Sequence, residues 1–130
     1  MATEAILVVD DNPTNLKLLR VLLVGEGYEV KTAVNGEEAL SLLKSFQPRL
    51  VLMDLQLPGI NGLALTQMIK ADPKTKDIVI IAVTAYAMKG DDQKAFDAGC
   101  DGYIAKPIDT RTLPSIVAQY LAGPASPATV

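Results

Sequence analysis

The sequence has no histidine, no tryptophan and a single cysteine, Cys100, among its 130 residues. Without histidine, a Ser-His-Asp triad, a histidine general base and a histidine metal ligand are all excluded. One cysteine cannot build a disulfide framework, which favours a reducing, cytoplasmic location. The absence of tryptophan and the presence of only two phenylalanines argue against an aromatic platform for nucleic-acid bases.

Basic runs and long apolar stretches are also missing. The net charge is −3 and the lysines and arginines are scattered, so the chain has no electrostatic footprint for DNA or RNA. No apolar stretch approaches the roughly 20 residues that span a bilayer, and the apolar run 5–9 is too short for a signal peptide. These features predict a soluble cytoplasmic protein whose partners are neither nucleic acid nor a membrane.

What the chain does contain is a regular alternation of two kinds of segment. Short β-branched runs predict strands, and the longer stretches between them have helical spacing. Strict alternation predicts an α/β fold with a doubly wound, five-stranded parallel sheet of the (βα)5 type. The predicted strands are residues 6–9, 28–32, 50–53, 78–83 and 102–105.

The predicted helices have recognisable ends. Thr14 or Asn15 is expected to begin the first helix, whose inward face carries leucines at 16, 19 and 23, and Asn35-Gly36 opens the second. The third covers about 62–71, the fourth about 89–98, and the fifth has an amphipathic pattern from 113 to 121. We expect one domain at residues 1–121 and a flexible tail at 122–130.

Polar residues stand at the carboxyl ends of four of the five predicted strands. Asp10-Asp11 follow the first strand and Asp54 follows the third. Thr84 follows the fourth, and Lys106 follows the fifth. A parallel sheet brings these ends to one edge, where ligands of such folds bind. The sequence therefore predicts a site built from three acids, a hydroxyl and a lysine.

Three carboxylates at one edge repel one another. Two unit charges 4 Å apart cost about 4 kcal/mol at an effective dielectric constant of 20, and one lysine offsets only part of this. Carboxylate oxygens are the preferred ligands of Mg²⁺, which commonly takes one or two of them together with water and a phosphate oxygen. The pattern predicts Mg²⁺ as the cofactor, with no organic cofactor. One carboxylate could then act as a nucleophile and form an aspartyl-phosphate, with Lys106 and Thr84 contacting the transferring oxygens.

Four segments of the chain resemble the response-regulator receiver family, over roughly the first 121 residues. They are Val8-Val9-Asp10-Asp11-Asn12, Leu52-Met53-Asp54-Leu55-Gln56-Leu57-Pro58-Gly59, Ile81-Ala82-Val83-Thr84-Ala85 and Gly102-Tyr103-Ile104-Ala105-Lys106-Pro107. The resemblance implies the flavodoxin-like strand order 2-1-3-4-5. It also implies a two-component signalling domain that catalyses only its own phosphorylation and dephosphorylation, and is not otherwise an enzyme.

The resemblance also assigns roles to individual residues. Asp54 becomes the phosphoacceptor, contacted by Thr84 and Lys106. The implied metal site consists of Asp11 as a direct ligand, Asp10 mostly through water, Asp54 itself and the backbone carbonyl of Gln56. Thr84 and Tyr103 become the switch pair, in which the aromatic rotamer follows a shift of the threonine.

The resemblance implies protein partners on both sides of the reaction. The phosphoryl donor is expected to be a phosphohistidine on a histidine kinase or a histidine phosphotransfer protein, because this chain has no histidine. We expect the donor to approach over Asn12, Pro13, Asn15 and Leu16. Output is expected as phosphorylation-dependent binding of a downstream protein through helix 4, strand 5 and helix 5.

Three other functions compete with this interpretation. An aspartyl-nucleophile phosphohydrolase needs an Asp-x-Asp pattern after the first strand, whereas this chain has adjacent Asp10-Asp11 there. An FMN-binding flavodoxin needs a neutral, glycine- and hydroxyl-rich loop at the same place, whereas residues 10–14 begin with two acids. A receiver-like interaction module that is never phosphorylated tends to lose pocket residues, and this chain keeps all of them.

Overall fold

A parallel sheet of five strands forms the centre of the computed structural model, which describes residues 4–85, 91–106 and 108–122. The strand order is β2-β1-β3-β4-β5, and every neighbouring pair is parallel. This confirms the predicted fold class and strand order. The strands are β1 (Ala5–Val9), β2 (Glu29–Ala33), β3 (Leu50–Asp54), β4 (Val79–Thr84) and β5 (Gly102–Ala105).

The predicted strands lie within one residue of the observed ones at each end. The central strand β3 is buried at every position, as its continuous apolar run indicates for a strand covered on both faces. The edge strand β2 has the pattern exposed, half-buried, exposed, half-buried, buried. The charged residues Glu29 and Lys31 on this edge discourage pairing with another chain.

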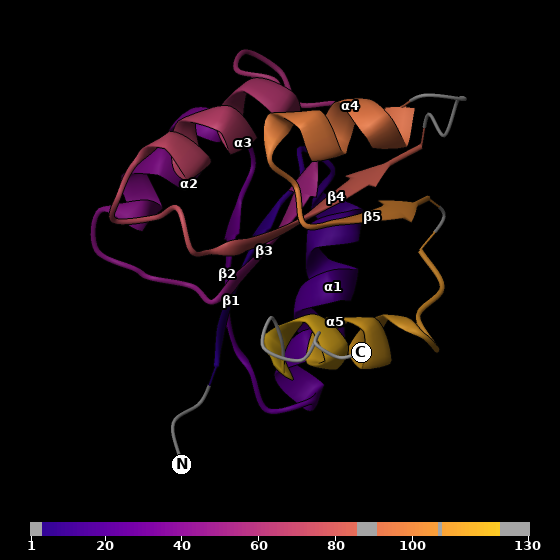
Figure 1. Ribbon diagram of the computed structural model, residues 1–130. Coiled ribbons are helices and arrows are strands. Elements are labelled where there is room, and N and C mark those ends of the chain that lie inside the picture. The colour runs from indigo at the N-terminus through magenta and orange to yellow at the C-terminus, as the bar shows by residue number, and fades with distance from the viewer. Residues whose placement is uncertain (1–3, 86–90, 107, 123–130) are drawn as a thin grey trace.

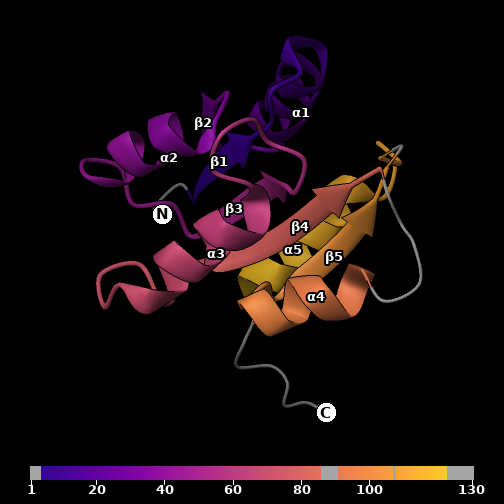
Figure 2. The same cartoon turned by 90° about the horizontal axis from the view of Figure 1, so that it is seen from above.

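Helices cover both faces of the sheet (Figure 1). One face packs against α1 (Pro13–Gly25) and α5 (Leu113–Ala122), and the other packs against α2 (Gly36–Leu43), α3 (Gly62–Ala71) and α4 (Asp91–Ala98). Two hydrophobic cores result. Leu19, Leu23 and Val117 belong to the first, and Ala39, Leu65 and Ala95 to the second. Figure 2 shows the same layers from above.

Asparagine side chains begin three of the helices. Asn12 accepts hydrogen bonds from the backbone amides of Thr14 and Asn15, so α1 begins at Pro13 and not at Thr14 or Asn15 as predicted. The reason is that a proline is well suited to the first helical position, directly after a capping residue. Asn35 and Asn61 cap α2 and α3 in the same way, and both of these helices begin where the sequence predicts.

The description of α4 begins at Asp91, and that of α5 extends to Ala122. Residues 89 and 90, which we predicted in the fourth helix, lie outside the described residues. Helix α5 ends at Ala122, one residue into the predicted tail, and 123–130 are likewise not described. Of the helices the structure describes, none has the length and apolar character that crossing a bilayer requires.

Candidate functional site

The three predicted acids meet at the carboxyl ends of β1 and β3. These strands pair in register, with Val9 opposite Met53, so the residues that follow them are neighbours. Asp10, Asp11 and Asp54 each have a carboxylate oxygen within 4.8 Å of the others. Asp10 and Asp54 are almost fully buried, whereas Asp11 is exposed. The structure therefore brings together the acidic cluster that the sequence predicts.

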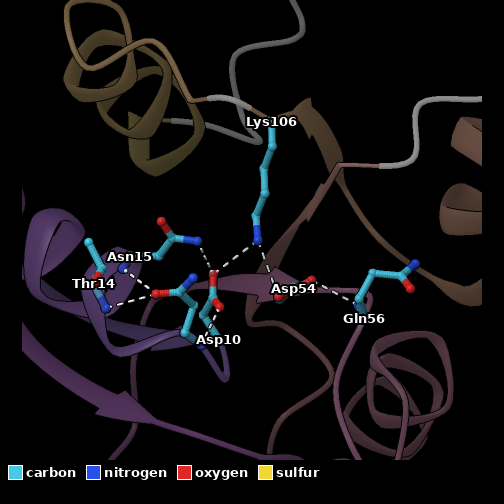
Figure 3. Close-up of polar contacts among 7 residues, drawn as sticks. Asp10, Thr14, Asn15, Asp54, Gln56 and Lys106 are labelled. Carbon is cyan, nitrogen blue, oxygen red and sulfur yellow. Dashed lines mark hydrogen bonds and ion pairs between the residues drawn. The ribbon is translucent and has the colours of Figure 1, made fainter.

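Both oxygens of Asp10 already have partners inside the protein (Figure 3). Its Oδ1 accepts from the backbone amide of Asn12 at 2.9 Å. Its Oδ2 accepts from Asn15 Nδ2 at 3.3 Å and from Lys106 Nζ at 3.2 Å. The side chain of Asp10 is thus held in one orientation by the first turn of α1 and by the lysine.

Lys106 lies between the two buried carboxylates, those of Asp10 and Asp54. Its ammonium lies 3.2 Å from Asp10 Oδ2 and 3.3 Å from Asp54 Oδ2, pointing from the end of β5 toward the ends of β1 and β3 (Figure 3). The other Asp54 oxygen, Oδ1, accepts from the backbone amide of Gln56 at 2.8 Å. The cluster therefore has three carboxylates and one ammonium within contact distance of two of them.

The electrostatics of the site reflect this surplus of negative charge. Burial raises the pKa of Asp54, the Asp10 carboxylate raises it further, and the Gln56 amide and Lys106 do not fully offset these effects. Burial alone would lower the pKa of Lys106, but Asp10 and Asp54 outweigh burial and raise this pKa above its ordinary value. Lys106 stays charged, while a negative charge on Asp54 is disfavoured by its surroundings.

Thr84 ends β4, the strand that pairs with β3 at Asp54, and Tyr103 lies on the next strand, β5. Thr84 is 1 % exposed. Alternation along β4 places it on the same face as Ala82, and Ala82 is the register partner of Tyr103 on β5. Tyr103 is half-buried and packs against the core on the side of α2, α3 and α4. The predicted switch pair therefore shares one face of the sheet.

A shallow groove opens beside Lys106 between α1 and the segment after β5. Its volume is about 360 Å³, and it is lined by Asn15, Leu18, Leu19, Ala85, Lys106 and Ile108. Leu18 is 44 % exposed, although it is a large apolar residue. Leu16 does not belong to the approach face as predicted, because it is buried in the core beside Leu19 and Leu23. Helical spacing turns position 16 inward and position 18 outward.

Sequence reasoning missed several contributors to the site. The contact of Asn15 with Asp10 and the place of Ile108 in the groove were not predicted. The capping role of Asn12 has a clear signal, since an asparagine directly before a proline is typical of a helix start. Ile108 has no such signal, because only the folded chain brings the end of β5 beside α1. Pro107, which ends the predicted Lys-Pro motif, lies outside the described residues.

The acidic cluster, the lysine and the strand order together define a receiver-type α/β domain. The profile of the response regulator receiver domain matches residues 6–118, and the chain belongs to this family. It is 42 % identical over 118 residues to the polar-differentiation response regulator DivK of Brucella anthropi, covering 91 % of this chain and 96 % of that protein.

Solved structures give the same result. A CheY-like response regulator receiver domain protein from Methanospirillum hungatei JF-1 superposes with a TM-score of 0.86 at 30 % identity, covering 93 % of this chain and 95 % of that one. The receiver domain of a sensor histidine kinase from Pseudomonas aeruginosa PAO1 superposes with a TM-score of 0.85 at 32 % identity, covering 94 % and 100 %. That structure has a magnesium ion coordinated in its active-site cleft.

Family membership identifies the chain as a signalling domain of two-component systems. It supports the receiver interpretation over the flavodoxin and phosphohydrolase interpretations that the sequence left open. It does not by itself assign the individual residues of the site.

Proposed function

We propose that Asp54 accepts a phosphoryl group from a phosphohistidine of a partner protein, in a reaction that requires Mg²⁺. The observation that carries this proposal is the imbalance of charge at the end of the sheet, where three carboxylates share one lysine. Such an arrangement is costly unless a cation binds to it. Asp54 is the member of the cluster that ends the central strand and contacts Lys106 directly.

The donor set fits Mg²⁺, which prefers oxygen ligands and keeps several waters. Within the described residues, Asp11 makes no hydrogen bond or ion pair and is exposed, so its carboxylate is available as a direct ligand. Asp10 already accepts from Asn12, Asn15 and Lys106, which suits contact through water. Asp54 and the backbone carbonyl of Gln56 complete the proposed protein ligands.

The transfer itself forms one bond and breaks one bond. A carboxylate oxygen of Asp54 attacks phosphorus, and the phosphorus–nitrogen bond to the partner's imidazole breaks, with its electron pair left on the imidazole nitrogen. Bound Mg²⁺ supplies charge neutralisation for the phosphoryl oxygens. Lys106 supplies a second positive charge, and Thr84 supplies a hydroxyl at the end of β4. Positioning and electrostatics account for most of phosphoryl-transfer catalysis.

The groove beside Lys106 is the proposed approach for the partner. Asn12 and Pro13 are exposed at the start of α1, and Leu18 and Ile108 contribute apolar lining to the groove. Contiguous exposed apolar surface is typical of protein interaction sites. The 60 % exposed Val21 lies one helical turn beyond Leu18 and extends the apolar surface along α1. We assign this surface to the histidine kinase or histidine phosphotransfer protein that donates the phosphoryl group.

Output is proposed to follow from the Thr84–Tyr103 pair. Movement of Thr84 toward a phosphoryl group on Asp54 would open space on the face that it shares with Tyr103, and the ring would turn inward. This is a shift between two populations, read by a downstream protein at α4, β5 and α5. Replacement of Thr84 by alanine should leave phosphorylation in place but abolish the phosphorylation-dependent binding of that partner. Normal switching in Thr84→Ala would contradict this route.

The direct test is mass spectrometry after incubation with acetyl phosphate and Mg²⁺. We expect the wild type to gain one phosphoryl group, and we expect neither Asp54→Asn nor the wild type in EDTA to gain it. No gain in the wild type would favour the unphosphorylated interaction module. Rapid multiple turnover of p-nitrophenyl phosphate would instead favour a phosphohydrolase.

A further inference from the structure

The first residue of α3, Gly62, lies directly against the backbone of the proposed phosphoacceptor. A Cβ atom placed on Gly62 would lie 2.5 Å from the carbonyl oxygen of Asp54 and 2.7 Å from the Cα of Leu55. Real Cβ contacts are almost never shorter than 3.0 Å. Because both nearest atoms belong to the backbone, no side-chain rotation could relieve the overlap.

The need for glycine here is purely steric. Among the described glycines, those with positive φ are Gly27, Gly59 and Gly99, and Gly62 is not one of them. An alanine could therefore adopt the backbone conformation of this position, and at the start of a helix it would carry no propensity penalty. Only the close approach to Asp54 and Leu55 excludes a side chain.

One hydrogen bond joins the start of α3 to Leu55, and two others order the first turn of the helix itself. The buried hydroxyl of Thr66 donates to the carbonyl of Gly62 at 2.8 Å, and the amide of Gly62 donates to the carbonyl of Leu55 at 3.4 Å. Asn61 caps the same turn through the amide of Ala64. A methyl group on Gly62 would have to break the bond to Leu55 or displace the strand-to-helix loop.

That loop carries the groups that set the orientation of the Asp54 carboxylate. The amide of Gln56 donates to Asp54 Oδ1 at 2.8 Å, and the amide of Leu55 donates to the carbonyl of Val83 on β4 at 3.1 Å. A displacement of Leu55 therefore moves both the amide that holds Asp54 and the Gln56 carbonyl assigned to the metal. We propose that Gly62 is a positioning residue, which sets the Mg²⁺ affinity of the site through its contact with the backbone of Asp54 and Leu55.

This inference rests on the proposed Mg²⁺-dependent function, and two readouts keep the two claims apart. The first is Mg²⁺ affinity by calorimetry on the full chain. The second is the amide resonance of Gln56 in ¹H–¹⁵N spectra without metal, which reports the loop directly. For Gly62→Ala we expect about tenfold weaker Mg²⁺ binding, as for other residues that orient metal ligands, and a shifted Gln56 resonance.

Gly102→Ala is the matched control. A Cβ on Gly102 would lie 2.7 Å from the ring and hydroxyl of Tyr120 on α5, so this variant adds the same methyl group against a side chain that can move, away from the loop. We expect it to bind Mg²⁺ as the wild type does and to leave the Gln56 resonance unchanged. Equal Mg²⁺ affinity in Gly62→Ala and the wild type, or equal losses in both variants, would overturn the positioning role.

A milder variant covers the case in which Gly62→Ala does not fold. Thr66→Val removes the hydrogen bond within α3 that fixes the carbonyl of Gly62, so it loosens the residue that contacts the loop and adds no overlap. We expect weaker Mg²⁺ binding in Thr66→Val and wild-type binding in Thr66→Ser, which keeps the hydroxyl. Wild-type affinity in Thr66→Val would overturn the inference. A wild-type chain that takes up no Mg²⁺ would contradict the proposed function, while the Gln56 resonance would still test the position of the loop.

Discussion

The two ends of the sheet use the same residue types in opposite ways. At the amino-terminal ends of β4 and β5, Lys70 contacts Asp101 at 2.9 Å and donates to the carbonyl of Ile78 at 2.7 Å. Asp101 also accepts from the amide of Ile80 at 2.9 Å. At the carboxyl-terminal ends, Lys106 lies among three carboxylates instead.

The two clusters differ in charge balance, and the difference distinguishes a structural ion pair from a candidate functional site. The Lys70–Asp101 pair is matched one to one and completed by backbone groups, so it fastens α3, β4 and β5 together. The cluster around Asp54 has more negative charge than its lysine offsets. A protein at its most stable would not keep this surplus, which is why we propose a cation site there. Mutations at the two ends should therefore differ in kind as well as in size.

The largest expected effect is on phosphorylation. Lys106→Met removes the positive charge next to Asp54, and we expect the rate of phosphorylation by acetyl phosphate to fall about 100-fold, as when a single stabilising donor is lost at other active sites. Lys70→Met, at the opposite end, should keep the wild-type rate. The rates would be measured at saturating Mg²⁺ by mass spectrometry. Similar rates in the two variants would remove the functional distinction between the ends.

The next effect is on stability. Here the larger effect is expected at the end of the sheet that carries Lys70. Lys70→Ala leaves the Asp101 carboxylate and the Ile78 carbonyl without their lysine donor, and we expect it to lower the free energy of unfolding by about 1.5 kcal/mol. Lys17→Ala, at an exposed position of α1, is the control and should change it by less than about 0.5 kcal/mol. Urea unfolding measures both. Equal values would mean that the matched pair does not fasten the helix to the sheet.

A smaller effect of opposite sign is expected for the two aspartates. Asp54→Asn removes a buried charge that Asp10 repels, so in EDTA it should raise the free energy of unfolding by about 1 kcal/mol. Asp101→Asn removes a charge that is matched by Lys70 and should lower it. Thermal unfolding in EDTA compares the two. A loss of stability in Asp54→Asn would show that its charge is fully compensated in the wild type.

The pH dependence should give the smallest effect. Because burial raises the pKa of Asp54 in the folded state, the folded chain binds a proton more readily there than the unfolded chain does. At neutral pH the charged Asp54 therefore lowers the free energy of unfolding. This destabilisation is lost as the pH falls through the folded-state pKa toward the unfolded-state pKa of about 4. The stability gap between Asp54→Asn and the wild type should narrow over this range in urea titrations with EDTA. A gap that widens at lower pH would have the wrong sign.

Local patterns in the sequence predict the elements of this fold well. Continuous apolar runs identify β3 and β4, and Asn35-Gly36 identifies the start of α2. The rule that parallel strands present their carboxyl ends on one edge is enough to bring Asp54, Thr84 and Lys106 together. These predictions succeed because they depend on spacing along the chain and on one topological rule.

Other features depend on contacts that local patterns do not contain. The strand order was predicted from the family resemblance and not from spacing. The groove beside Lys106 joins Leu18 to Ile108 across most of the chain, and the overlap that Gly62 avoids depends on how closely α3 packs on β3. Leu16 shows a different limit: helical spacing correctly places it in the core, whereas its closeness to the site along the chain wrongly suggested a place on the partner's approach.

The central position of β3 determines which parts of the protein a group attached to Asp54 would contact. Because β3 lies between β1 and β4, a group attached to Asp54 would touch two independent sensors at once. The strand on one side leads to the acids proposed to hold a cation, and the strand on the other ends in Thr84, the proposed switch residue. Both contacts would depend on β1 and β4 lying next to β3 in the sheet, and not on the order of the strands along the chain. A circular permutant opened in a loop at the far end of the sheet should therefore keep both the chemistry and the response.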